Sequence, residues 1–175
     1  MSNFNEGYYC NCCGKVHEEL LMSYVSPFPD YVYDIPSNEQ EDRIEMYDDL
    51  CIIDDEYYFI RGCIELPVMD GNGSFIWDVW VSLSEENYNK TIEYWDAKGR
   101  EEELEPMFGW LSTSLPCYPE TINLKTRVDT RPAGIAPYIE LEPTEHPLAL
   151  EQRNGISKVR IKQIAEELCQ QDDQS

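Results

Sequence analysis

The sequence predicts an α+β fold: a single domain with an antiparallel β-sheet, helices packed mainly on one side, and an N-terminal Cys/His metal knuckle. Residues 58–66 and 75–83 alternate between apolar and polar positions on either side of a turn sequence, as the strands of a β-hairpin do. Helix-start signals at Ser84 and Ser157 precede apolar residues at helical spacing. A metal-binding spacing is present in Cys10-x-x-Cys13-Gly14-x-x-His17.

The length and composition fit one folded unit. A chain of 175 residues is within the usual size of a domain. Its apolar fraction of 42% and aromatic fraction of 12% argue against disorder. We therefore expect one domain over residues 1–175, with a knuckle segment at 8–24, a sheet core at 50–142 and C-terminal helices at 146–170.

The sheet is predicted from runs with a period of two. The runs at 58–66 and 75–83 are separated by Asp70-Gly71-Asn72-Gly73, a strong turn sequence. Shorter runs at 50–54, 122–128 and 139–141 predict further half-buried strands. Strands that follow one another through short turns pair antiparallel, and the helices are expected to cover one side of the resulting sheet.

Three helical segments are expected. An acidic helix is predicted from Asn38 to Tyr47. Ser84 is a suitable N-cap, and the apolar residues that follow it at core-facing spacing are Tyr88, Ile92 and Trp95.

The last helix is expected to begin at Ser157. Its buried stripe is formed by Ile161, Ile164, Ala165 and Leu168. Three basic residues near its N-terminus, Lys158, Arg160 and Lys162, oppose the helix dipole. We expect the acidic body of the domain to neutralise them.

The knuckle is the strongest chemical signal in the chain. Two thiolates separated by two residues can bind one tetrahedral ion, and His17 is close enough in sequence to add a nitrogen ligand. A second pair of ligands at similar spacing does not follow. We predict structural zinc bound by Cys10, Cys13, His17 and a distant residue, with Cys51 as the leading candidate and Cys12, Cys63 and His146 as alternatives.

Other uses of these residues remain open at this point. Cys10 and Cys13 could carry redox chemistry, which would require a thioredoxin-like strand–helix setting. Three ligands and a water would make a hydrolytic site, although no HExxH sequence is present. Cys117 and Cys169 lack neighbouring ligands in the sequence and are expected to be structural, and His146 to be a capping residue before a helix.

The net charge of −22 is the largest deviation in composition. Acids outnumber bases by 11 to 2 in residues 1–50, by 10 to 4 in 51–100 and by 9 to 3 in 101–150, so the charge covers the folded body. Such a field disfavours nucleic acid and anionic membranes, and attracts basic proteins. With no signal-peptide pattern and an odd number of cysteines, seven, the sequence indicates a cytoplasmic protein with reduced thiols or metal ligands.

Several short motifs occur together and in order along the chain. They are the knuckle, Leu50-Cys51-Ile52-Ile53-Asp54, Phe59-Ile60-Arg61-Gly62, Trp80-Val81-Ser82-Leu83-Ser84-Glu85, Phe108-Gly109-Trp110-Leu111, Tyr118-Pro119-Glu120-Thr121, His146-Pro147-Leu148-Ala149 and Asn154-Gly155-Ile156. With these motifs the chain resembles, from about residue 8 to 168, a mainly bacterial family called domain of unknown function 2199. The resemblance implies a bacterial cytosolic domain with the knuckle as a family feature, and it implies no particular activity. The chain departs from the family pattern at Asp78, where the pattern has Gly, and at the extra Cys12.

Together these observations favour a small acidic zinc-binding protein that binds a basic protein partner, as an immunity-type or regulatory inhibitor would. The alternative is a small metal-dependent hydrolase or thiol enzyme that uses Cys10, Cys13, His17 and His146. A closed site with four protein ligands indicates a structural role, whereas an open site with three ligands beside a cleft indicates catalysis.

Overall fold

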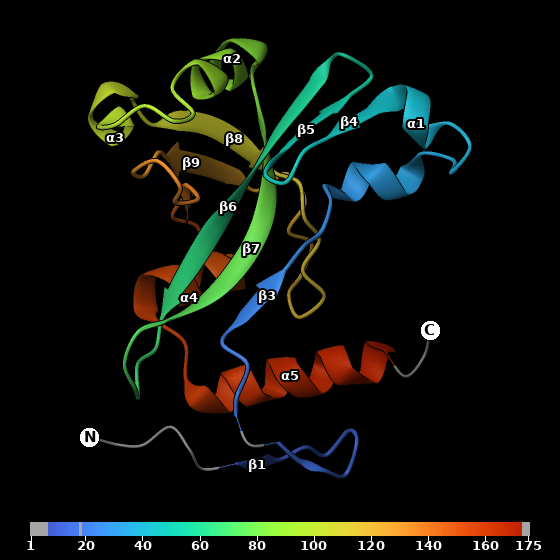
Figure 1. Cartoon of the computed structure of the whole chain (residues 1–175). Coiled ribbons are helices and arrows are strands. Elements are labelled where there is room, and N and C mark those ends of the chain that lie inside the picture. Colours follow the sequence, from blue (N-terminus) through green and yellow to red (C-terminus); the bar gives the residue numbers. More distant parts are fainter. Residues whose placement is uncertain (1–6, 18, 173–175) are drawn as a thin grey trace.

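Figure 1 presents the computed structural model, which describes residues 7–17 and 19–172. The N-terminal elements, in chain order, are β1 (Tyr8–Tyr9), β2 (Val16–His17), β3 (Ser23–Val25), the 3-10 helix η1 (Asp30–Asp34), α1 (Gln40–Arg43), β4 (Ile44–Met46) and β5 (Leu50–Ile53). The remaining elements are β6 (Tyr57–Pro67), β7 (Ser74–Leu83), α2 (Glu85–Glu93), α3 (Arg100–Glu103), β8 (Met107–Leu111), β9 (Lys125–Asp129), β10 (Tyr138–Leu141), α4 (Pro147–Asn154) and α5 (Lys158–Asp172).

The centre of the molecule is a closed five-stranded barrel. Strands β6, β7, β8, β9 and β10 are neighbours in that order and pair antiparallel, and β10 then pairs with β6. This last pairing is parallel, with Tyr138 opposite Cys63. Strands that alternate in direction around a ring with an odd number of members must include one parallel pair. The expectation of a simple antiparallel sheet is therefore wrong: the sheet is closed into a barrel.

Barrel closure depends on the long strand β6, which has two partners along one edge. Its first residues pair with β5, from Tyr57 opposite Ile53 to Ile60 opposite Leu50, and its later part meets β10. Gly62 lies between these two pairings. A Cβ atom at Gly62 would lie 2.7 Å from Ile139 Cδ1, so glycine permits the close approach of β10.

Further strands extend the sheet outside the barrel. Strand β4 pairs antiparallel with β5, and β3 runs parallel to β7 with Tyr24 opposite Trp77. The full order is β3-β7-β8-β9-β10-β6-β5-β4, with β7 also paired to β6. The ribbon of β4 and β5 thus projects from one side of the barrel (Figure 1).

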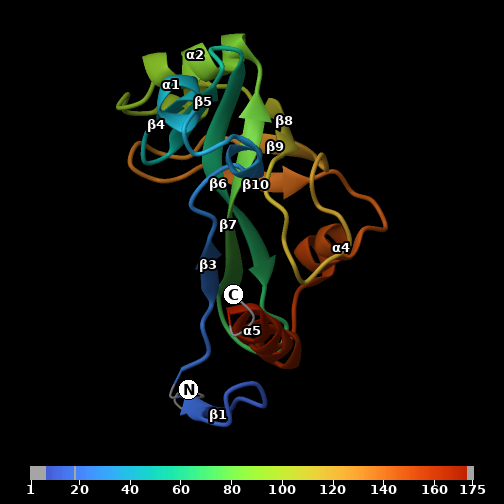
Figure 2. The ribbon, with the colours of Figure 1, turned by 90° about the vertical axis from the view of Figure 1, so that its right-hand side faces the viewer.

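The main apolar core fills the barrel and continues under three helices. Fully buried residues from the strands include Ile64, Phe75 and Val79, and the same cluster contains residues of α2, α4 and α5. Helices α2 and α3 lie at one end of the molecule, and α4 and α5 lie toward the other (Figures 1 and 2). The helices do not share one side of a sheet, because a closed barrel leaves apolar surface to cover at both ends.

Several local predictions are confirmed. Residues 57–67 and 74–83 form the expected antiparallel hairpin. Ser84 caps α2 by accepting a hydrogen bond of 3.2 Å from the Asn87 backbone, and the Ser157 hydroxyl accepts one of 3.1 Å from the Arg160 backbone. At the basic start of α5, Arg160 is neutralised by another part of the domain as expected, since its Nε lies 3.0 Å from a carboxylate oxygen of Glu151 in α4. Lys162 instead pairs with Glu166 of α5 itself, at 3.8 Å.

Other local predictions are wrong. The helix expected over residues 38–47 is only the single turn α1, and residues 44–46 instead form β4. Cross-strand pairing overrides helix propensity there. Ile92 is 47% exposed and does not join Tyr88 in the core. Strands β3, β4 and β8 were not predicted. Among the described residues, no helix combines the length and the apolar character that crossing a lipid bilayer requires.

Candidate metal centre

The knuckle is a short β-ribbon with a tight turn. Strands β1 and β2 pair antiparallel, with Tyr8 opposite His17. The turn between them is closed by two backbone hydrogen bonds of 2.9 Å, from Cys10 to the Lys15 carbonyl and from Gly14 to the Cys10 carbonyl. Gly14 has φ of 68°, a left-handed conformation that glycine adopts without strain. The sequence thus folds locally so that its three ligand residues face one another.

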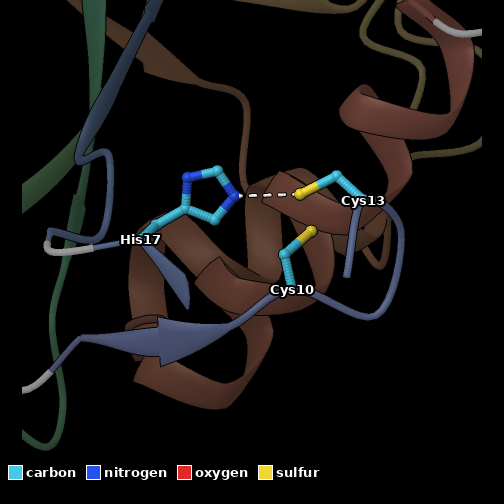
Figure 3. A group of neighbouring side chains, drawn as sticks. All are labelled: Cys10, Cys13 and His17. Carbon is cyan, nitrogen blue, oxygen red and sulfur yellow. Dashed lines mark hydrogen bonds between the residues drawn. The ribbon is translucent and has the colours of Figure 1, made fainter. Parts of the chain in front are cut away.

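The ligand atoms of Cys10, Cys13 and His17 lie within 4.8 Å of one another (Figure 3). The Cys13 sulfur is 3.3 Å from His17 Nε2. Around a tetrahedral zinc ion, bond lengths of about 2.3 Å to sulfur and 2.0–2.1 Å to nitrogen place those two atoms about 3.5 Å apart. Two sulfurs and one imidazole nitrogen gathered in this way could hold a metal ion.

The surroundings of the three ligands differ. Cys10 is buried with 1% exposure, whereas Cys13 and His17 are exposed. The His17 ring stacks on Tyr8, with centroids 5.2 Å apart, which fixes its orientation. A hydrogen bond from the backbone of Cys13 lowers the pKa of the Cys10 thiol despite its burial. A lowered pKa favours the thiolate, the form that binds a metal.

Helix α5 packs along the knuckle. Asn11 donates a hydrogen bond of 3.2 Å to Glu166, and the Lys162 ammonium lies 6.0 Å from the centre of the Tyr8 ring. One turn further along the same helix face, hydrogen bonding with the thiols of Cys12 and Cys10 raises the pKa of Cys169. The bond with Cys12 is the first cause of a pKa for Cys169 raised to about 12. Figures 1 and 2 agree in placing α5 directly beside this ribbon.

Cys51, the expected fourth ligand, is placed elsewhere. It is completely buried in a second apolar cluster with Phe59 and Trp80, and burial raises the pKa of its thiol to about 12. Its strand β5 lies at the opposite end of the molecule from β1 (Figure 1). The structure therefore does not bring Cys51 to the knuckle, because its inward position in β5 points it into the core beside Phe59.

The alternative ligands Cys63 and His146 also lie apart from the cluster. The Cys63 sulfur is 3.7 Å from a carboxylate oxygen of Asp78 on the neighbouring strand. His146 is the N-cap of α4, where its Nδ1 accepts a hydrogen bond of 3.1 Å from the Leu148 backbone. Its capping role is confirmed.

The position of Cys169 near the knuckle was not predicted from the sequence. This residue was expected to be a structural cysteine because its sequence neighbours include no ligand. Lys162, Glu166 and Cys169 share one helical face at spacings of four and three, and this face differs from the buried one that holds Ile161 and Ile164. The spacing of these three residues predicts a second helical face, but it does not predict that the knuckle packs against that face.

The comparison with protein families bears on this site. A family model described as "Uncharacterized protein conserved in bacteria (DUF2199)" matches residues 9–156. The chain belongs to this family. The DUF2199 match includes Cys10, Cys13 and His17 and ends before α5, so Cys169 lies beyond it. No match was found among curated proteins or among solved structures.

Proposed function

We propose that this protein is a zinc-stapled acidic domain of the cytoplasm that binds a basic protein. Zinc is held by Cys10, Cys13 and His17, and it fixes the knuckle rather than reacting with a substrate. The convergence of these three ligand atoms within 4.8 Å is the observation that carries the metal site. The net charge of −22 supports the choice of partner.

The fourth ligand in this proposal is Cys169 of α5, with Cys12 as its competitor. The thiols of Cys12 and Cys10 raise the pKa of Cys169, and Cys169 lies on the helix face that packs on the knuckle. Its sulfur is not among the atoms that lie within 4.8 Å of one another, so α5 would have to move closer to complete the site. A fourth thiolate would close the site, as structural zinc requires, and it would tie the N-terminal ribbon to the C-terminal helix. This staple replaces the link to the sheet that was expected through Cys51.

The proposed partner follows from how the basic residues are used. Arg43 and Arg61 form ion pairs with carboxylates of their own chain, at 2.7 Å in each case. Arg100 is buried and donates to the backbone carbonyls of Trp95, Arg131 and Ile135. All thirteen Lys and Arg residues are already counted in the net charge of −22, so a surplus of carboxylates remains at the surface after these pairs are formed. A basic protein would gain both steering and electrostatic complementarity from that surface.

Metal analysis tests the site. We expect one zinc per chain in protein expressed with ample zinc, and loss of that zinc in Cys10→Ser. In the cobalt-substituted protein, Cys169→Ser should reduce the sulfur-to-cobalt charge-transfer absorption from that of three thiolates to that of two, whereas Cys63→Ser is a control that should leave it unchanged. Absence of bound metal in the parent protein would contradict the metal site. An unchanged spectrum in Cys169→Ser would show that Cys169 is not a ligand.

Binding to a basic protein tests the second half of the proposal. Affinity measured by calorimetry should fall steeply as salt rises from 50 to 500 mM, since the Debye length shortens from about 14 Å to about 4 Å over this range. An acidic protein of similar size is the control and should not bind. Tight binding that ignores salt, or that prefers the acidic control, would contradict the proposal.

A second candidate is a metal-dependent hydrolase or thiol enzyme. The exposure of Cys13 and His17 favours it, because an open face of the metal could take water. Binding of an added ligand such as azide to the cobalt-substituted protein would support this candidate. A four-ligand site should resist such binding, which separates the two functions.

A further inference from the structure

A groove of about 810 Å³ lies between α2 and the ribbon of β4 and β5, far from the knuckle. Its apolar surface includes the ring of Tyr47, which is 58% exposed, and Ile92, which is 47% exposed. Tyr58 and Trp95 add two more rings to the lining. Exposed aromatic surface of this kind is typical of places where a partner binds.

The charged lining of the groove is acidic. Glu45, Asp48 and Asp49 all line it, and no basic side chain does so among the described residues. Asp49 is paired with Arg61 at 2.7 Å. In the described part of the chain, neither Glu45 nor Asp48 forms an ion pair with a basic residue.

A buried polar group faces the same groove. Tyr88 lines it, is only 1% exposed, and packs against Tyr58 with ring centroids 5.0 Å apart. Within residues 7–17 and 19–169, its hydroxyl is the one buried side-chain polar atom that lacks a hydrogen-bond partner. Buried polar groups are nearly always satisfied, so an orphan hydroxyl beside a groove points to a ligand that completes it.

The position of the hydroxyl supports this assignment. Burial first, and then the nearby Tyr47, Cys51, Glu45 and Tyr58, raise the pKa of Tyr88 to about 12. Three of these four neighbours line the groove. The hydroxyl is therefore enclosed among residues that line the groove, and it keeps its proton at neutral pH.

We infer that this groove binds an arginine side chain of the basic partner. Glu45 and Asp48 face the guanidinium charge, the Tyr58 and Trp95 rings pack on its planar face and stem, and the Tyr88 oxygen accepts one of its hydrogen bonds. Arginine fits better than lysine because its planar group offers five donors and stacks on aromatic rings. This inference rests on the proposed basic partner and names the place where that partner is recognised.

The test uses the full-length protein with a Gly/Ser peptide that carries one central arginine. Titration followed by backbone amide NMR should shift the signals of residues 45–52 and 88–95. A peptide with citrulline, the uncharged counterpart of arginine, should bind about tenfold more weakly than the arginine peptide. A peptide with lysine should bind about threefold more weakly than the arginine peptide. Equal binding of the citrulline or lysine peptide would overturn the assignment to a guanidinium group.

Matched variants locate the binding. The double variant Glu45→Gln/Asp48→Asn should raise the Kd for the arginine peptide about tenfold. The control Glu120→Gln/Glu145→Gln removes the same charge at exposed positions near α4 and should change the Kd by less than about twofold. Equal effects of the two variants would mean that the acidic surface attracts cations without a specific site. That result would contradict the groove as the binding site, but it would be consistent with an acidic domain that binds basic proteins. No binding of the arginine peptide, with salt-dependent binding of a basic protein retained, would also overturn the groove alone.

Tyr88→Phe separates recognition from folding. It removes only the orphan hydroxyl, so the folded protein should become more stable while the arginine peptide binds about threefold more weakly. A variant that merely disturbed the structure would lose stability and affinity together. Tyr88→Phe with unchanged affinity would remove the hydroxyl from the site.

Discussion

In the barrel, Ile64, Phe75 and Val79 are completely removed from water, whereas Tyr9 and Val16 in the knuckle remain 55% and 67% exposed. The barrel can be stabilised by the hydrophobic effect, because its strands enclose an apolar interior. A ribbon of two-residue strands cannot bury enough surface to be stable by itself. The knuckle therefore depends on polar contacts with α5 and on the proposed metal. The three residues that could hold a metal ion lie where the chain has little core, and metal binding is a common way to stabilise small or peripheral structures.

The largest expected effect is in the main apolar core. Phe75→Ala should lower the free energy of unfolding by about 3–5 kcal/mol, because it leaves a cavity among the rings of Tyr24 and Trp77. Phe108→Ala is the control, since Phe108 is 51% exposed and packs edge-on to Trp110, and it should lose no more than about 1 kcal/mol. Urea denaturation followed by circular dichroism measures both. Similar losses at the two sites would contradict the packed barrel.

A smaller effect is expected where α5 is joined to α4. Glu151→Gln should lower the free energy of unfolding by about 2 kcal/mol, because Glu151 accepts hydrogen bonds from Tyr118 and from Arg160 and its side chain is 18% exposed. The control is Glu140→Gln, whose pair with Arg127 is exposed at both partners and should contribute less than about 1 kcal/mol. If both variants behaved alike in denaturation, the link between these helices would be no more than a surface ion pair.

Alkaline pH should weaken the fold through Tyr24, which is half-buried in β3, and through Tyr88, which is buried in α2. Burial raises the pKa of Tyr24 and of Tyr88 to about 12, while tyrosine in an unfolded chain titrates near 10. The folded state holds these protons more tightly, so their contribution is complete below about pH 10 and is lost as the pH rises toward 12. Unfolding midpoints measured from pH 8 to 12 should show this decline. Tyr88→Phe should reduce the decline of the unfolding midpoint with pH. The control Tyr9→Phe changes an exposed tyrosine and should leave that decline unchanged.

The smallest effect on global stability should follow removal of the metal. Three of the four proposed ligands lie within eight residues of sequence and can hold the ion in the unfolded chain as well. Only the proposed bond to Cys169 then favours the folded state, so chelation should lower the barrel's free energy of unfolding by only about 1 kcal/mol. Hydrogen exchange should instead accelerate at the amides of residues 8–17. If a chelator lowered the free energy of unfolding as much as Phe75→Ala does, the stability of the barrel would depend on the metal. That result would contradict the proposal that the metal stabilises mainly the knuckle.

Local features were predictable because they depend on neighbours in the sequence. The hairpin of β6 and β7, the caps at Ser84 and Ser157, and the grouping of Cys10 with His17 each span few residues, and each was read correctly. The prediction of a helix over residues 38–47 was wrong because the conformation of this segment depends on a residue outside it. Its helical pattern was weak, and pairing of Ile44 with Ile53 on a neighbouring strand decided its conformation.

The sequence by itself determined that three metal ligands would meet and that the surface would be strongly acidic, because ligand spacing and charge count are properties of the chain. Only the tertiary structure decided that the sheet closes through Gly62 into a barrel, that Cys51 is enclosed in the core, and that Cys169 lies against the knuckle. Each of these depends on segments brought together from distant parts of the chain, and no local pattern records which surfaces will pack against each other.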